Sequence, residues 1–172
     1  MALIPGENSF VSVAEADAYA AVHGLASWPQ PPAEGEDTRL SEKEGALVRA
    51  ADWMNTLAWS GARVEWDQPL CWPRQGMAFE GVAVPEDALP AQVKAAQVEA
   101  AAIFLTGEDL FAAQERSGRV QQETVGPITV RYFDDASAGK FFPALAGLLA
   151  SFLTQVPGRE SSASYRVLEA AI

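Results

Sequence analysis

The residues of this chain that could do chemistry are few and lie far apart. Its 172 residues include one histidine, His23, and one cysteine, Cys71. Catalysis by side chains needs a nucleophile beside a base, or paired carboxylates in a cleft. The sequence has neither a nucleophile-elbow motif nor a glycine-rich phosphate loop. We therefore expect the protein not to be an enzyme and to need no cofactor.

A structural role explains both the single histidine and the single cysteine. His23 falls at the expected end of a helix, where a protonated imidazole suits the negative end of the helix dipole. Cys71 lies between Leu70 and Trp72 and is expected to be a small buried apolar residue, with no partner for an internal disulfide. One histidine and one cysteine are also too few for a zinc cluster.

Pairs of adjacent acidic residues can ligate a hard cation, and three of the pairs in this sequence are candidates. They lack the alternating spacing and the glycine of a calcium loop, so we interpret them as solvated turns. The sequence leaves metal binding at these turns open. The pairs are Glu36-Asp37, Glu86-Asp87 and Asp134-Asp135.

Composition argues against two classes of partner. The formal net charge is -11, and the 12 Lys and Arg residues are scattered, so the sequence predicts no basic face for nucleic acid. It has no run of about 18 apolar residues, and its first residues are too short and too polar for a signal peptide. These features predict a soluble intracellular protein that does not bind membranes.

Helical spacing recurs in four segments. Ser12 and Glu15 have the spacing of a capping box, which predicts a first helix up to about His23 with Gly24 as its stop. The same spacing at Ser41 and Glu44 predicts the start of a second helix. Its apolar stripe is expected to be Leu47, Ala50, Ala51, Met54, Leu57 and Ala58.

The third and fourth helices are expected after prolines. Pro90 suits a first-turn position, and Gly107 ends the third helix. An apolar helix is expected to follow Pro143. The apolar face of the third helix is expected to contain Val93, Ala96, Ala100, Ile103 and Phe104.

The remaining segments are not helical. Alternating residues on both sides of Gly126-Pro127 predict a β-hairpin within 119–133, and an isolated hairpin is marginal in water. Residues 61–90 lose all periodicity, and their prolines predict a long irregular Trp/Pro loop. A second loop, Pro- and acid-rich over 29–37, has Trp28 as its one expected anchor. The expected fold is one mainly α domain over 1–172: a bundle of about four helices with one β-hairpin.

The five tryptophans raise the possibility of base stacking. Stacking platforms for single strands combine aromatic faces with a basic groove. Here the positive charges of the two nearby arginines are balanced by the negative charges of acidic neighbours. Trp53 and Trp59 are also six residues apart, which puts them on opposite faces of the expected second helix. We therefore favour packing in the core or at an interface. The cancelling charges are Arg63 and Arg74 against Glu65 and Asp67.

Five segments resemble, in the same order, small proteins of tailed bacteriophages and prophages that carry the description DnaT-like single-stranded DNA-binding. The most distinctive run is Leu-x-Trp-Pro-Arg-x-Gly at Leu70 to Gly76. Sequences of this pattern also resemble the head-tail adaptor, or connector, proteins of long-tailed phages. The segments are "SFVSVAEADAYAA", "EKEGALVRAADWMN", "WSGARVEWDQPLCWPRQG", "LPAQVKAAQVEAA" and "ETVGPITVRYF".

The adaptor resemblance implies a structural virion protein at the neck between head and tail, assembled in the host cytoplasm. Its partners would be copies of itself in a ring of twelve, the portal protein, and a stopper or tail-completion protein. Genomic DNA would pass through the ring without specific binding, which an acidic subunit favours. The alternative is a replication accessory that binds single-stranded DNA.

Candidate interface residues follow from this expectation. Pro73 restricts the backbone of its loop, so Trp72 can be presented to a partner at little entropic cost while Arg74 pairs with an acidic neighbour. In the other interpretation, which stays open, Trp72 caps the helical core and Arg74 only reaches past it to solvent. Residues 156–172 are a possible docking arm. The full set of candidates is Trp72, Pro73, Arg74, Arg63, Tyr132, Tyr165, Arg166 and Leu168.

Overall fold

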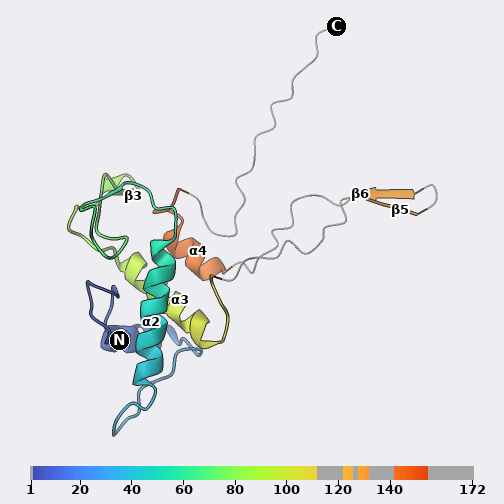
Figure 1. Ribbon diagram of the computed structural model, residues 1–172. Coiled ribbons are helices and arrows are strands. Elements are labelled where there is room, and N and C mark those ends of the chain that lie inside the picture. Colours follow the sequence, from blue (N-terminus) through green and yellow to red (C-terminus); the bar gives the residue numbers. More distant parts are fainter. Residues whose placement is uncertain (1, 112–121, 126–127, 132–141, 155–172) are drawn as a thin grey trace.

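The computed structural model describes residues 2–111, 122–125, 128–131 and 142–154 (Figure 1). The helices within them are α1 (Val13–His23), α2 (Leu40–Asn55), α3 (Ala91–Leu105) and α4 (Pro143–Leu149). Short strands form three antiparallel pairs: β1 (Ala62–Arg63) with β2 (Arg74–Gln75), β3 (Ala78–Phe79) with β4 (Val82–Ala83), and β5 (Gln122–Val125) with β6 (Ile128–Arg131). The expected mainly helical fold with a β-hairpin is confirmed.

Helix α1 begins and ends as the sequence predicts. The Ser12 hydroxyl accepts a hydrogen bond from the Glu15 amide at 3.2 Å, and the Glu15 carboxylate accepts one from the Ser12 amide at 2.8 Å. This bond from the Ser12 amide is the largest of the effects that lower the pKa of Glu15. Gly24 ends the helix with a left-handed φ of 62°.

Helix α2 corrects two predictions. It begins at Leu40, with Arg39 as its N-cap and no side-chain cap, so the capping box predicted at Ser41 and Glu44 is wrong. The chain already turns at Asp37, whose side chain accepts from the Arg39 amide at 2.9 Å. The helix also ends at Asn55, so Trp59 and the predicted stripe residues Leu57 and Ala58 are not on it.

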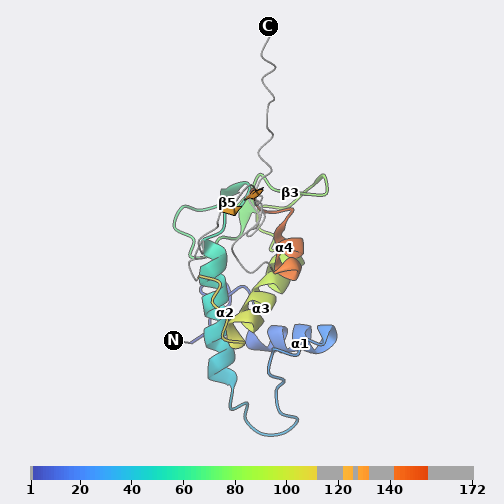
Figure 2. The same cartoon turned by 90° about the vertical axis from the view of Figure 1, so that its right-hand side faces the viewer.

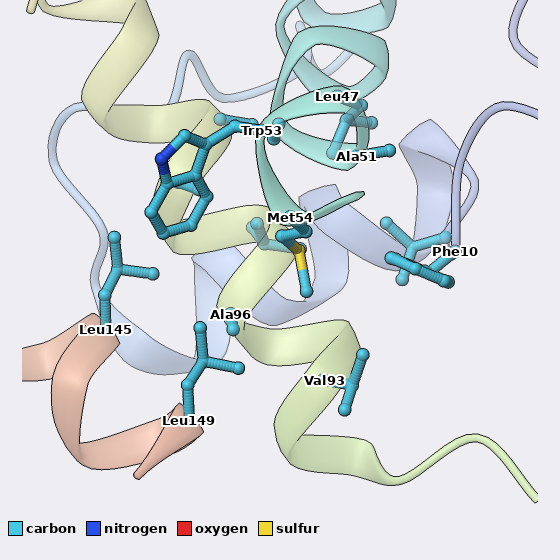
Figure 3. Close-up of a cluster of buried hydrophobic side chains, with 14 of the residues drawn as sticks. Phe10, Leu47, Ala51, Trp53, Met54, Val93, Ala96, Leu145 and Leu149 are labelled. Carbon is cyan, nitrogen blue, oxygen red and sulfur yellow. The ribbon is translucent and has the colours of Figure 1, made fainter. Parts of the chain in front are cut away.

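The core lies where α2 packs against α3. Alanines on both helices let the two backbones approach closely, and α4 covers the end of this contact (Figure 3). Trp59 is buried as well, and its indole N–H donates to the Met54 carbonyl at 2.7 Å. Figure 3 labels the central residues: Phe10, Leu47, Ala51, Trp53, Met54, Val93, Ala96, Leu145 and Leu149.

The long loop after α2 is more ordered than the sequence predicts, because β1–β2 and β3–β4 divide it into two short hairpin-like pieces. Gly61 makes the first piece possible. Its φ is 65°, and a Cβ there would lie 2.5 Å from the Gln75 carbonyl oxygen. Only glycine fits this close approach without a shift of the backbone.

The β5–β6 hairpin pairs Gln122 with Arg131 and Val125 with Ile128, which confirms the predicted hairpin. Among the helices and strands of the described residues, each of its strands contacts only the other. Over those same residues, none of the helices has the length and apolar character needed to cross a membrane.

Candidate interaction surface

The Trp72-Pro73-Arg74 loop is buried within the subunit. Trp72 is 3% exposed and packs edge-on against Trp59 and Phe152, with ring centroids 5.8 and 5.7 Å away. Of the two interpretations left open by the sequence, the structure has Trp72 capping the core. Its indole N–H has no hydrogen-bond partner among the described residues.

Arg74 has a different set of partners from the predicted one. Its guanidinium donates to three backbone carbonyls, those of Ser60 at 2.7 Å, Gly61 at 2.9 Å and Cys71 at 3.1 Å. The expected pairing with an acidic neighbour is therefore wrong. The acceptors of Arg74 are backbone carbonyls of the loop that lie outside the strands. The side chain is only 8% exposed, so it does not reach past the core to solvent either. Arg74 holds the loop closed from inside.

Cys71 is buried beneath this loop, as predicted. Burial raises the pKa of its thiol to about 12, so the thiol stays protonated near neutral pH. A protonated, buried thiol is a packing group and a poor nucleophile.

The residue that the sequence reasoning missed is Trp66, which is 92% exposed. It sits on a turn organised by Gln68, whose side-chain oxygen accepts from the Val64 and Glu65 amides at 3.1 Å each. The Gln68 amide group donates to the Leu70 carbonyl at 2.8 Å and the Pro73 carbonyl at 3.0 Å.

The candidate residue Arg63 closes this Trp66 turn, since its guanidinium donates to the Gln68 carbonyl at 2.7 Å. The signal available in the sequence was that Trp66 has an acidic residue on each side, Glu65 and Asp67, and such neighbours favour solvent. The other candidates, Tyr132, Tyr165, Arg166 and Leu168, and the possible arm 156–172, lie outside the described residues.

An apolar groove of about 490 Å³ runs between α1 and α3. Tyr19 and His23 stack along its α1 side with ring centroids 4.1 Å apart, and Lys94 on α3 reaches Glu15 at 3.1 Å. The Tyr19 hydroxyl donates to Glu99, and burial is the main reason its pKa rises to about 12. Further lining residues are Val11, Ala91, Gln92, Ala95, Val98 and Leu148.

The Pro- and acid-rich loop is tied down at both ends. Lys43 on α2 is fully buried and binds Asp17 at 2.8 Å and Asp37 at 2.6 Å. The indole N–H of Trp28, the predicted anchor, donates to the same Asp17 carboxylate at 2.7 Å. Asp37 therefore serves an internal ion pair, and the described residues contain no group of three potential metal ligands.

Every Lys and Arg side chain between residues 2 and 111 already has a partner. Four pair with carboxylates and two bind backbone carbonyls. Residues 1–111 carry 17 Asp and Glu against 6 Lys and Arg, whereas residues 112–172 carry 6 of each. The whole net charge of -11 thus falls in the first part of the chain. The pairs are Arg39–Glu42, Lys43–Asp17, Lys43–Asp37, Arg49–Asp109 and Lys94–Glu15, and the carbonyl binders are Arg63 and Arg74.

Comparison with known proteins places this chain in a family. The family described as "Putative DnaT-like ssDNA binding protein" matches residues 2–169, nearly the whole chain. No curated protein and no solved structure matches the chain. The family description names single-stranded DNA binding and no virion component. On the extent of this match, the chain belongs to the DnaT-like ssDNA-binding protein family.

Proposed function

We propose that the protein is a structural assembly subunit, the head-tail adaptor of a tailed phage, and that it works through its interfaces without catalysis. Copies would form a ring, expected to contain twelve subunits, between the portal and a stopper or tail-completion protein. Genomic DNA would pass through the ring, which would belong to the neck of the virion.

The observation that carries this proposal is the engagement of every cation from residue 2 to 111. Binding to a DNA backbone needs Lys and Arg side chains that are free to replace the counterions around the phosphates. Here those side chains are held by carboxylates and carbonyls on a strongly acidic segment. Such a surface repels a DNA backbone and suits a passage through which DNA slides.

The β5–β6 hairpin supports an assembly role as well. A two-stranded hairpin gains little stability on its own in water, and this one contacts no other described helix or strand. A neighbouring subunit or another neck protein could stabilise the hairpin by strand addition or by covering one face.

The test is electron microscopy of the protein mixed with the portal protein encoded in the same genome. An added ring of density beneath the portal is the expected result. A folded protein that leaves the portal unchanged at high concentration would count against the adaptor function.

Single-stranded DNA binding is the second candidate, and the family description favours it. If it is correct, the cations of residues 112–172 must carry the binding, because those of residues 2–111 are engaged. We would measure binding of a labelled oligonucleotide by fluorescence anisotropy across a salt series. Affinity that falls steeply with salt, and that is lost when Arg116, Arg119, Arg131 and Lys140 are replaced by Ala, would establish this function instead.

A further inference from the structure

We propose that the acid-rich segment between α1 and α2 is a strap that acid releases from the subunit while the α2–α3 core stays folded. The strap consists of residues 25–38, and it is fastened by Lys43, a buried lysine of α2. This inference goes beyond the proposed function and depends neither on the portal nor on DNA.

Two anchors hold the strap on the subunit. At one end the Trp28 side chain is 1% exposed, and its indole N–H donates to the Asp17 carboxylate of α1 at 2.7 Å. At the other end the Asp37 carboxylate accepts from Lys43 at 2.6 Å. Residues 30–36 between the anchors are all exposed, and Figure 2 shows the strap as a blue loop that extends past the start of α2. The attachment of the strap therefore depends on its two ends.

Both anchors meet at Lys43. Its Nζ atom lies 2.8 Å from the Asp17 carboxylate, 2.6 Å from the Asp37 carboxylate and 5.9 Å from the centre of the Trp28 ring. The lysine side chain is fully buried, so its charge has these two carboxylates in place of water. A buried charge that loses its partners is strongly destabilising. The closed strap therefore requires ionised carboxylates.

Charged groups of α1, the strap and α2 lie around this cluster. Besides Asp17, Asp37 and Lys43 they include Arg39, whose half-exposed guanidinium pairs with Glu42. The hydrogen bond from Lys43 is the main reason that the pKa of Asp37 is lowered. A carboxylate with a lowered folded-state pKa is ionised at neutral pH, and its contribution to stability is lost as the pH falls below about 4. The strap is thus closed at neutral pH and released in acid.

The core has no comparable dependence on acid. The α2–α3 contact is made of apolar side chains and the hydrogen bonds of Gln97, and none of these groups titrates. The other ion pairs named above join side chains that are 39–57% exposed, and exposed pairs contribute little to stability. Protonation should therefore act first on the strap. These exposed pairs are Arg39–Glu42, Arg49–Asp109 and Lys94–Glu15.

The experiment is hydroxyl-radical footprinting of the full chain from about pH 7 to about pH 3, with oxidation measured by peptide mass spectrometry. Trp28 reports on the strap, and Met54, fully buried in the core, reports on global unfolding. Trp66, which is 92% exposed, serves as the reference for the radical dose. In the wild type, oxidation of Trp28 relative to Trp66 should rise roughly tenfold or more as the pH falls below about 4, while Met54 stays protected.

Neutral variants should open the strap without acid. Asp17→Asn combined with Asp37→Asn mimics the protonated carboxylates and leaves Lys43 as an unpaired buried charge, so Trp28 should be oxidised roughly tenfold faster at neutral pH. Adding Lys43→Met removes that charge and should close the strap again, because an apolar side chain of similar length can stay buried. Glu36→Gln, at an exposed acidic residue of the strap, should change nothing.

Several results would overturn the acid-released strap. One is a Trp28 that stays protected in the double variant, and another is a triple variant that stays as open as the double one. Oxidation of Met54 over the same pH range as Trp28 would also overturn it, because acid would then unfold core and strap together. A wild-type Trp28 that is oxidised like Trp66 at neutral pH would mean that the strap is not closed at all.

Discussion

Gln97 is a buried residue whose whole hydrogen-bonding capacity is used. Its side-chain oxygen accepts from the Phe10 amide at 2.9 Å and the Val11 amide at 3.2 Å. Its amide group donates to the Ser9 hydroxyl at 2.8 Å and the Leu47 carbonyl at 2.9 Å. One side chain on α3 thereby satisfies the segment before α1 and a carbonyl of α2.

Replacing Gln97 by Met keeps the volume and leaves these buried groups without a partner. Because an orphaned buried donor or acceptor costs about 1–3 kcal/mol, we expect Gln97→Met to lower the free energy of unfolding by about 3 kcal/mol. Urea unfolding measures this change. Gln92→Met, at a partly exposed position of the same helix, serves as the control. A loss for Gln97→Met below about 1 kcal/mol would show that the network adds little.

Arg74 is expected to keep the Cys71 thiol out of reach. The native thiol should react slowly with iodoacetamide at neutral pH, because its pKa of about 12 leaves almost no thiolate. Arg74→Ala removes donors from the carbonyls of Ser60, Gly61 and Cys71, so the loop should open more often. We expect alkylation to be roughly tenfold faster, as a cost of about 1.4 kcal/mol implies. Arg39→Ala, which breaks an exposed pair, should not change the rate.

At the scale of the element, two serines with the same sequence signature should behave differently. Ser12→Ala removes a side-chain cap from α1 and should cost about 1 kcal/mol of stability. Ser41→Ala changes a residue inside the first turn of α2, where alanine is the better helix former, and should be neutral or slightly stabilising. Thermal unfolding of both variants checks this. Equal losses would mean that Ser41 acts as a cap after all.

These serines also show what can be predicted from local sequence. The start of α1, its end at Gly24 and the presence of the β5–β6 hairpin follow from signals within a few residues. The Ser41–Glu44 spacing does not mark the start of α2, because a serine and a glutamate three residues apart can also lie inside a helix. The turn at Asp37 had already started the chain into α2.

Interactions between distant segments could not be predicted from the sequence. Lys43 and Asp17 are 26 residues apart, and Gln97 and Phe10 are 87 apart. No periodicity links such positions. The burial of Trp72 and the exposure of Trp66 have the same origin, because each depends on which neighbours the fold brings to a loop.

The ion pairs of Lys43 connect α2 to α1 and to the acid-rich loop, so they affect the molecule as a whole. The bond to Lys43 is the main reason that the pKa of Asp37 is lowered. A lowered folded-state pKa contributes stability that is fully present above the unfolded value, near pH 4. That contribution is lost as the pH falls through the folded-state value.

We therefore expect Lys43→Met to flatten the acid side of the stability profile. Between about pH 6 and pH 3 the variant should lose less stability than the wild type, although it starts from a lower value. Urea unfolding at several pH values gives the two profiles. Lys94→Met removes an exposed pair with Glu15 and should keep most of the wild-type slope, because the Ser12 amide is the larger cause of the lowered Glu15 pKa. Parallel profiles for Lys43→Met and the wild type would contradict this account.

The response to salt distinguishes the two proposed functions, because they predict opposite signs. Subunits with a net charge of -11 repel one another, so raising the salt from about 0.05 to 0.5 M should screen this repulsion and strengthen self-association. Single-stranded DNA binding should weaken over the same range, because phosphate contacts release counterions. Sedimentation equilibrium and oligonucleotide anisotropy on the same samples would show which response the protein has. Self-association that weakens with salt would contradict this account of net repulsion between the acidic subunits.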